Sequence, residues 1–145
     1  MEQKSGMEDE IIQNRQKALT AFQENSTELN LWKAIIAFEG VEFITSGRGK
    51  DKVGSTRFKY EVSKKCGSGG RHYDGESVDG YGNELWIVID GVKKEKSISR
   101  STVNRAFQNA LAVEGKIKGP KQLNVPGAHS YLYPIFVQYG IINPV

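Results

Sequence analysis

Cysteine is almost absent from this chain, which has 145 residues and a single thiol, at Cys66. One thiol with no CxxC partner excludes a fold held together by internal disulfides. Long apolar runs are absent as well, because no stretch approaches the roughly 20 apolar residues that a bilayer span requires. The opening sequence, MEQKSGMEDEIIQNRQ, lacks the apolar core of a secretory signal. We therefore expect a cytoplasmic protein that does not enter a membrane.

The composition is otherwise ordinary for a globular protein. Hydrophobic residues make up 38% of the chain and charged residues 26%, whereas glycine is frequent, with 16 residues. The length lies near the commonest domain size. We expect residues 1–145 to form a single domain, with residues 1–7 flexible and residues 66–82 forming a glycine-rich loop.

The net charge of +3 is the sum of blocks of opposite sign. Residues 31–65 carry eight basic and four acidic side chains, and residues 93–121 carry eight and two. Residues 1–30 and 66–92 are acidic overall. Two basic blocks are typical of a phosphate-binding face if the fold brings them together. The alternative is that these lysines and arginines only solvate exposed strands.

Two helices are predicted at the start of the chain. Residues 8–24 place apolar side chains at helical spacing, which is typical of an amphipathic helix whose apolar stripe faces the core. Thr27 or Ser26 can cap a second helix that ends at Gly40, so that the two helices form a hairpin. The apolar stripe of the first helix consists of Ile11, Ile12, Ala18, Leu19 and Phe22.

The middle of the chain predicts a mostly antiparallel sheet of four strands. Residues 41–46 and 57–62 alternate with period two, as half-buried strands do. Residues 85–89 are continuously apolar, which suits a central strand. The dipeptide Asp90-Gly91 predicts a two-residue hairpin turn, followed by a basic edge strand over residues 92–98.

Two more helices are predicted in the C-terminal part. Ser99 or Ser101 can cap a helix that ends at Gly115, and residues 129–140 form a second helix with Pro134 near its first turn. The fold class is therefore α+β, with an N-terminal helical hairpin, an antiparallel sheet and two C-terminal helices. The buried stripe of the first of these helices is predicted to be Val103, Ala106, Phe107, Ala110 and Leu111.

Motifs that carry catalysis are missing. The stretch GRGKDKVGST lacks the lysine that follows the last glycine of a phosphate-binding loop. The segment with Cys66 and His72 has neither zinc-finger nor calcium-loop spacing. His129 and Ser130 are adjacent on a helix, so their side chains point in different directions. We expect no catalytic residues, no metal site and no cofactor, and hence a protein that is not an enzyme.

The stretch KKEKSISRSTVNRAFQNAL is the most informative for function. If its apolar stripe faces the core, the exposed face carries Arg100, Asn104, Arg105, Gln108 and Asn109. Arg, Asn and Gln can read base edges, and the preceding lysines suit phosphate contacts. A solvated surface helix would have the same composition, which is the alternative.

Two resemblances bear on this stretch. ISRSTVNRAF resembles the recognition helix of helix-turn-helix regulators, but a strand precedes it where that motif has its first helix, so no helix-turn-helix fold is predicted. SISRSTVNRAFQNAL, GKIKGPKQLN and GAHSYLYPIFVQYGII together are similar to the C-terminal half of small bacterial proteins from mobile elements and prophages. That resemblance implies a protein that binds DNA or RNA, or one that disables a host defence protein.

The first hypothesis is a nucleic-acid-binding accessory protein, with DNA preferred over RNA as the partner. The second is an anti-CRISPR-like inhibitor that binds a nucleic-acid-processing protein, for example through the acidic residues 74–84. The third is an enzyme whose distant residues converge. The residues expected to contact nucleic acid are Arg48, Lys50, Lys52, Arg57, Lys59, Lys93, Lys94, Lys96, Arg100, Asn104 and Arg105.

Overall fold

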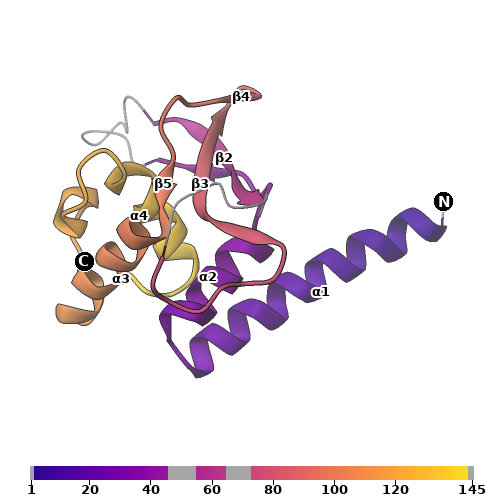
Figure 1. Cartoon of the computed structure of the whole chain (residues 1–145), viewed down its shortest axis with the longest axis horizontal. Coiled ribbons are helices and arrows are strands. Elements are labelled where there is room, and N and C mark those ends of the chain that lie inside the picture. Colours follow the sequence, from indigo (N-terminus) through magenta and orange to yellow (C-terminus); the bar gives the residue numbers. More distant parts are fainter. Residues whose placement is uncertain (1, 46–54, 65–72, 144–145) are drawn as a thin grey trace.

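The computed structural model describes residues 2–45, 55–64 and 73–143, and the side chains from residue 8 onward. Over these residues the chain has the predicted α+β fold, in which helices pack against one face of a mostly antiparallel sheet (Figure 1). Part of the predicted glycine-rich loop and part of the first basic block lie outside the described residues. The predicted nucleic-acid contacts that fall there are Arg48, Lys50 and Lys52. Cys66 and His72, in the segment for which no metal site is predicted, also lie outside the described residues.

The chain begins with the predicted helical hairpin, formed by α1 (Glu2–Glu24) and α2 (Glu28–Ala37). Thr27 caps α2, because its hydroxyl accepts a hydrogen bond from the backbone N–H of Asn30 at 3.2 Å. The prediction that Ile11 and Ile12 face the core is wrong, since they are 46% and 56% exposed. The reason is length: α2 is much shorter than α1, and the N-terminal part of α1 extends beyond the rest of the molecule (Figure 1).

Arg15 ties the two helices together. Its Nε donates to the carbonyl of Ala37 at 3.0 Å, and its Nη2 donates to the carbonyl of Glu39 at 3.2 Å. These carbonyls lie at the C-terminal end of α2, where backbone acceptors lack helical partners and the helix dipole favours a cation. The guanidinium therefore supplies hydrogen bonds to the backbone carbonyls at the end of α2 and fixes the position of α1 beside it.

The sheet has the strand order β1-β2-β3-β4, with β5 also paired to β3. All of the pairings are antiparallel. At the predicted turn, Asp90 and Gly91 both have positive φ, 52° and 79°, as a type I′ hairpin requires. The strands are β1 (Phe43–Ile44), β2 (Arg57–Lys64), β3 (Tyr81–Ile89), β4 (Val92–Lys93) and β5 (Ile98–Ser99).

The strand predicted over residues 92–98 is divided into β4 and β5. Ile89 pairs with Val92, whereas Leu85 pairs with Ile98, so residues 94–97 form a bulge opposite only two residues of β3. The central strand is also longer than predicted, because β3 begins at Tyr81, inside the expected glycine-rich loop. This bulge, residues 94–97, contributes two lysines to the candidate site.

The C-terminal helices are α3 (Arg100–Ala112) and α4 (His129–Gln138), joined through a 3₁₀ helix, η1 (Pro120–Leu123). Ser99 caps α3, and Gly115 has a φ of +75° where the chain leaves the helix, as predicted. As predicted, α4 begins at His129, and Pro134 lies inside it, just beyond the first turn.

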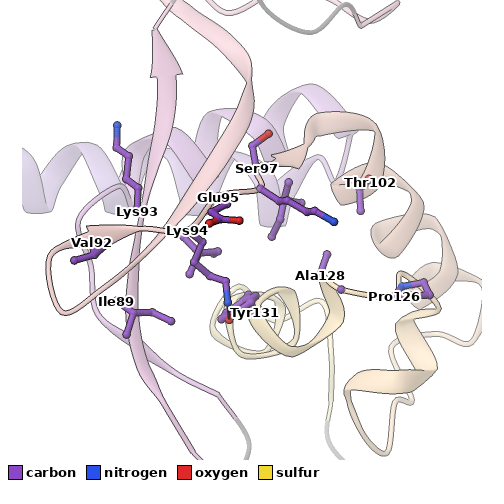
Figure 2. Close-up of a pocket in the computed structure, with 14 residues that line it drawn as sticks. Ile89, Val92, Lys93, Lys94, Glu95, Ser97, Thr102, Pro126, Ala128 and Tyr131 are labelled. Atoms are coloured by element: carbon purple, nitrogen blue, oxygen red, sulfur yellow. Dashed lines mark hydrogen bonds between the residues drawn. The ribbon is translucent and has the colours of Figure 1, made fainter.

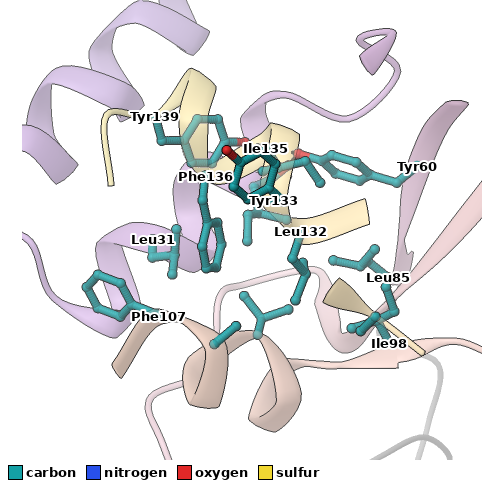
Figure 3. Close-up of a cluster of buried hydrophobic side chains, with 14 of the residues drawn as sticks. Leu31, Tyr60, Leu85, Ile98, Phe107, Leu132, Tyr133, Ile135, Phe136 and Tyr139 are labelled. Atoms are coloured by element: carbon teal, nitrogen blue, oxygen red, sulfur yellow. Dashed lines mark hydrogen bonds between the residues drawn. The ribbon is translucent and has the colours of Figure 1, made fainter. Parts of the chain in front are cut away.

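The buried side chains form one cluster between the inner face of the sheet and the helices (Figure 3). Phe107 of α3 is 1% exposed, and its ring lies 5.7 Å from that of Phe22 on α1. The predicted stripe on α3 is confirmed except at Leu111, which is 47% exposed. The core therefore joins the N-terminal hairpin directly to the C-terminal helices.

Two tyrosine hydroxyls meet inside this core. The hydroxyl of Tyr60 on β2 donates to the carbonyl of Ile35 and lies 3.1 Å from the hydroxyl of Tyr139. Tyr139 also donates to the carbonyl of Ala34 at 3.3 Å. Burial is the main cause that raises the pKa of both hydroxyls above the ordinary tyrosine value. Both side chains therefore remain neutral in the folded protein.

Replacing Phe107 with alanine should lower the free energy of unfolding by about 3 to 5 kcal/mol, because it removes a buried ring and leaves a cavity. Leu111→Ala on the exposed face of the same helix is the matched control and should change it by less than about 0.5 kcal/mol. Urea unfolding of both variants measures the difference. Equal effects would show that the two faces of α3 are assigned wrongly.

The buried tyrosines should make the protein sensitive to alkali. Their folded-state pKa values are raised, so their contribution to stability is complete below the unfolded value of about 10 and is lost as the pH rises above it. Between about pH 8 and about pH 11, the free energy of unfolding should therefore fall less for Tyr139→Phe than for the parent protein. Urea titrations at the two pH values measure this fall, and an equal fall in the variant and the parent protein would contradict the prediction.

Candidate functional site

A pocket of about 680 Å³ lies beside the β3–β4 hairpin (Figure 2). The bulge and the start of α3 form its walls, and the inner face of the hairpin together with the start of α4 forms its floor. No local pattern in the sequence indicates it, because its lining residues come from three separate segments. The lining residues that the site uses are Ile89, Lys94, Glu95, Lys96, Ile98, Thr102, Ala128 and Tyr131.

The floor of the pocket is apolar. Ile89 and Ile98 come from the strands, Ala128 precedes α4, and Tyr131 lies in its first turn. The Tyr131 ring is held in place by an edge contact with Phe58, at 5.1 Å between centroids. Such a floor suits the flat face of an apolar or aromatic ligand.

The rim of the pocket is basic and comes from the bulge. Nζ of Lys94 donates to the hydroxyl of Tyr131 at 3.1 Å and lies 5.5 Å from the centre of its ring, as Figure 2 shows. Lys96 is exposed, and within the described part of the chain neither Lys94 nor Lys96 forms an ion pair. Two ammonium groups without acidic partners therefore border an apolar floor.

The opposite face of the hairpin carries the other predicted lysines that the structure describes, Lys59 and Lys93. Lys59 pairs with Val88, and Val88 pairs with Lys93, so the two basic blocks meet across three adjacent strands. Trp86 lies two residues before Val88 on the same face. Lys93, however, is bound to Glu61, with Nζ 2.8 Å from the carboxylate.

Acidic partners neutralise most of the cations on this outer face. Nη1 of Arg57 lies 3.3 Å from Glu42, and Nζ of Lys64 lies 3.6 Å from Glu39. These side chains are largely exposed, and such pairs contribute little to stability. They do reduce the net positive charge that the outer face presents. The bulge is thus the part of the hairpin with the least compensated charge.

The prediction that Arg100 lies on the exposed face of α3 is wrong. Its side chain is 1% exposed, and its Nε and Nη2 donate to the two carboxylate oxygens of Glu28 at 2.6 and 2.7 Å. Arg100 is three residues before Val103 and seven before Phe107, so it lies on their buried stripe. It therefore has no guanidinium free for nucleic acid.

Further partners complete the environment of Arg100. Nη1 donates to Oδ1 of Asn83 at 3.2 Å, and the guanidinium carbon lies 4.4 Å from the ring centre of Tyr73 and 5.5 Å from that of Trp32. Burial raises the pKa of Tyr73, and the Glu28 carboxylate raises it further, while Arg100 lowers it. Arginine suits such a site because its planar group bonds at the edge and stacks on its faces.

Some of the other polar side chains of α3 form hydrogen bonds within the protein, and others are exposed to solvent. Nδ2 of Asn109 donates to the carbonyl of Leu123 at 2.8 Å, which joins α3 to η1. Oδ1 of Asn104 accepts from Gln108 within the helix at 3.2 Å. Arg105 is exposed, as predicted. Of the two arginines predicted on this helix, only Arg105 is therefore available to a partner.

Comparison with known proteins adds no identity. The chain matches no protein-family model, no curated protein and no solved structure at a significant level. No cluster of three or more His, Cys, Asp or Glu side chains in the described segments is arranged to hold a metal ion. Among the same residues, no helix has both the length and the apolar character needed to cross a bilayer. The candidate site is therefore defined by its geometry alone.

Replacing Arg100 with alanine should lower the free energy of unfolding by about 3 to 5 kcal/mol, because Glu28 would remain largely buried without its partner. Arg105→Ala is the matched control and should change it by less than about 0.5 kcal/mol. In the double variant Arg100→Met with Glu28→Leu, much of the loss should be recovered. Chemical denaturation measures all three, and a small effect of Arg100→Ala would contradict the structural role.

Proposed function

We propose that the protein binds nucleic acid through the bulged β3–β4 hairpin. The observation that carries the proposal is the meeting of the two basic blocks there. Lys59 and Lys93 lie on the outer face, and Lys94 and Lys96 border the pocket on the other side. Each of these lysines was predicted as a phosphate contact, and the fold gathers them around one short hairpin.

The chemistry of the hairpin suits phosphates. Lysine ammonium groups bind phosphate oxygens as point charges and do not select a base. A projecting two-stranded ribbon also has dimensions that a nucleic-acid groove accepts. Lys94 and Lys96 are the principal contacts, because they have no acidic partner among the described residues, whereas Lys93 must leave Glu61 to bind. Binding is then electrostatic and depends strongly on salt.

Replacing both Lys94 and Lys96 with alanine should weaken binding and reduce its dependence on salt. Each lost phosphate contact lowers the slope of log affinity against log salt by about 0.7 for a single strand and about 0.9 for a duplex. The double variant should therefore lose about 1.4 to 1.8 from the slope. Fluorescence anisotropy with labelled oligonucleotides over a series of salt concentrations measures it.

The matched control is Lys17→Ala with Lys33→Ala, which removes the same charge from exposed positions on the N-terminal hairpin. Its slope should match that of the parent protein. Absence of binding to single-stranded DNA, duplex DNA and RNA at low salt would refute the proposal. Recovery of a stable protein partner from nuclease-treated lysate would then favour the inhibitor hypothesis.

A further inference from the structure

We propose that the pocket beside the hairpin receives one unpaired nucleobase, so that the protein prefers single-stranded nucleic acid to duplex. This inference rests on the proposed function and specifies its substrate class. Ile89, Ile98 and Tyr131 would contact the base, while Lys94 and Lys96 hold the phosphates on either side of it.

The size and shape of the pocket suit a base. Its volume of about 680 Å³ lies within the range of about 300 to 1,000 Å³ that is usual for small-molecule sites. An aromatic base exposes two apolar faces, and the apolar floor can bury one of them. A base in a duplex already stacks on both neighbours, so only an unpaired or extruded base can enter. The pocket therefore distinguishes single strands by shape.

The polar groups around the floor match the edge of a base. The Glu95 carboxylate can accept from an amino or imino group, and the Thr102 hydroxyl can donate or accept. These groups come from the bulge and from the first turn of α3, on the same walls as the lysines. An apolar floor, a hydrogen-bonding wall and a cationic rim correspond to the three parts of a nucleotide.

A fatty acid would also combine an apolar part with an anion. Its long chain, however, needs an extended apolar channel, whereas this pocket is open to solvent and has Glu95, Ser97 and Thr102 in its walls. The nucleobase is therefore the occupant that the lining favours. Decanoate serves as the competing probe in the tests below.

The first test removes bases and keeps phosphates. Oligothymidylate and an abasic strand of the same length carry equal charge, so a protein that binds phosphates alone binds them equally. Burial of a base should make the abasic strand bind at least about fivefold more weakly. Equal affinities would overturn the inference and leave the proposed function intact. Failure of both strands, and of duplex DNA and RNA, to bind at low salt would refute the proposed function itself.

The second test fills the pocket. Ala128→Met extends a side chain from the pocket floor, and Ala112→Met adds the same group at an exposed site on α3. The filled variant should bind oligothymidylate no better than the abasic strand, while the control keeps the full difference. Should Ala128→Met fail to fold in a thermal melt, Ile89→Phe narrows the same space from the strand side.

A folded, pocket-filled variant that keeps the parent's preference for oligothymidylate would overturn the inference. A second result would also overturn it. If decanoate occupied the pocket at concentrations that leave oligothymidylate bound, the bases would lie elsewhere. Decanoate that competes with oligothymidylate but leaves the abasic strand bound would support it.

Discussion

The buried ion pair between Arg100 and Glu28 determines where α3 begins. It joins two residues that are 72 positions apart in sequence. A cation at the start of a helix opposes the helix dipole, and removing two charges from water is costly. Several contacts must be in place together to offset these costs. They are the bidentate bonds to Glu28, the bond to the side-chain oxygen Oδ1 of Asn83, and the rings of Tyr73 and Trp32. The pair therefore fixes the relative positions of α2, β3 and α3.

This constraint explains the bulge. The turn at Asp90 and Gly91 fixes one end of the return strand, and the pairing of Ser99 with Glu84 beside Arg100 fixes the other. A regular hairpin would place residue 97 opposite Glu84, so two residues are left over. They are absorbed in residues 94–97, where the strand leaves the regular ladder. The position of the lysines beside the pocket thus follows from the ion pair of Arg100, which immediately follows the return strand.

Local features were predictable from the sequence, and long-range features were not. The Thr27 and Ser99 caps and the Asp90-Gly91 turn depend on neighbouring residues, and the sequence predicts all three, with Ser26 and Ser101 left as alternative caps. For Arg100 two signals conflict, because its charge predicts an exposed position whereas its helical spacing from Phe107 predicts a buried one, and the spacing proves decisive. The exposure of Ile11 and Ile12 depends on the length of a partner helix. The pocket depends on tertiary contacts between segments that share no motif.

A count of charges along the sequence treats all lysines alike, but the structure distinguishes those paired with carboxylates from those that are not. Glu61, Glu42 and Glu39 neutralise Lys93, Arg57 and Lys64 on the outer face. A phosphate that binds one of these three cations must first displace a carboxylate, so its net gain is small, whereas Lys59 on the outer face forms no ion pair within the described residues. At the bulge, Lys94 and Lys96 form no ion pair among the described residues, and Lys94 donates to the hydroxyl of Tyr131. Glu95 adds one acidic side chain beside them. The pocket side of the hairpin is therefore where binding of a phosphate is most favourable.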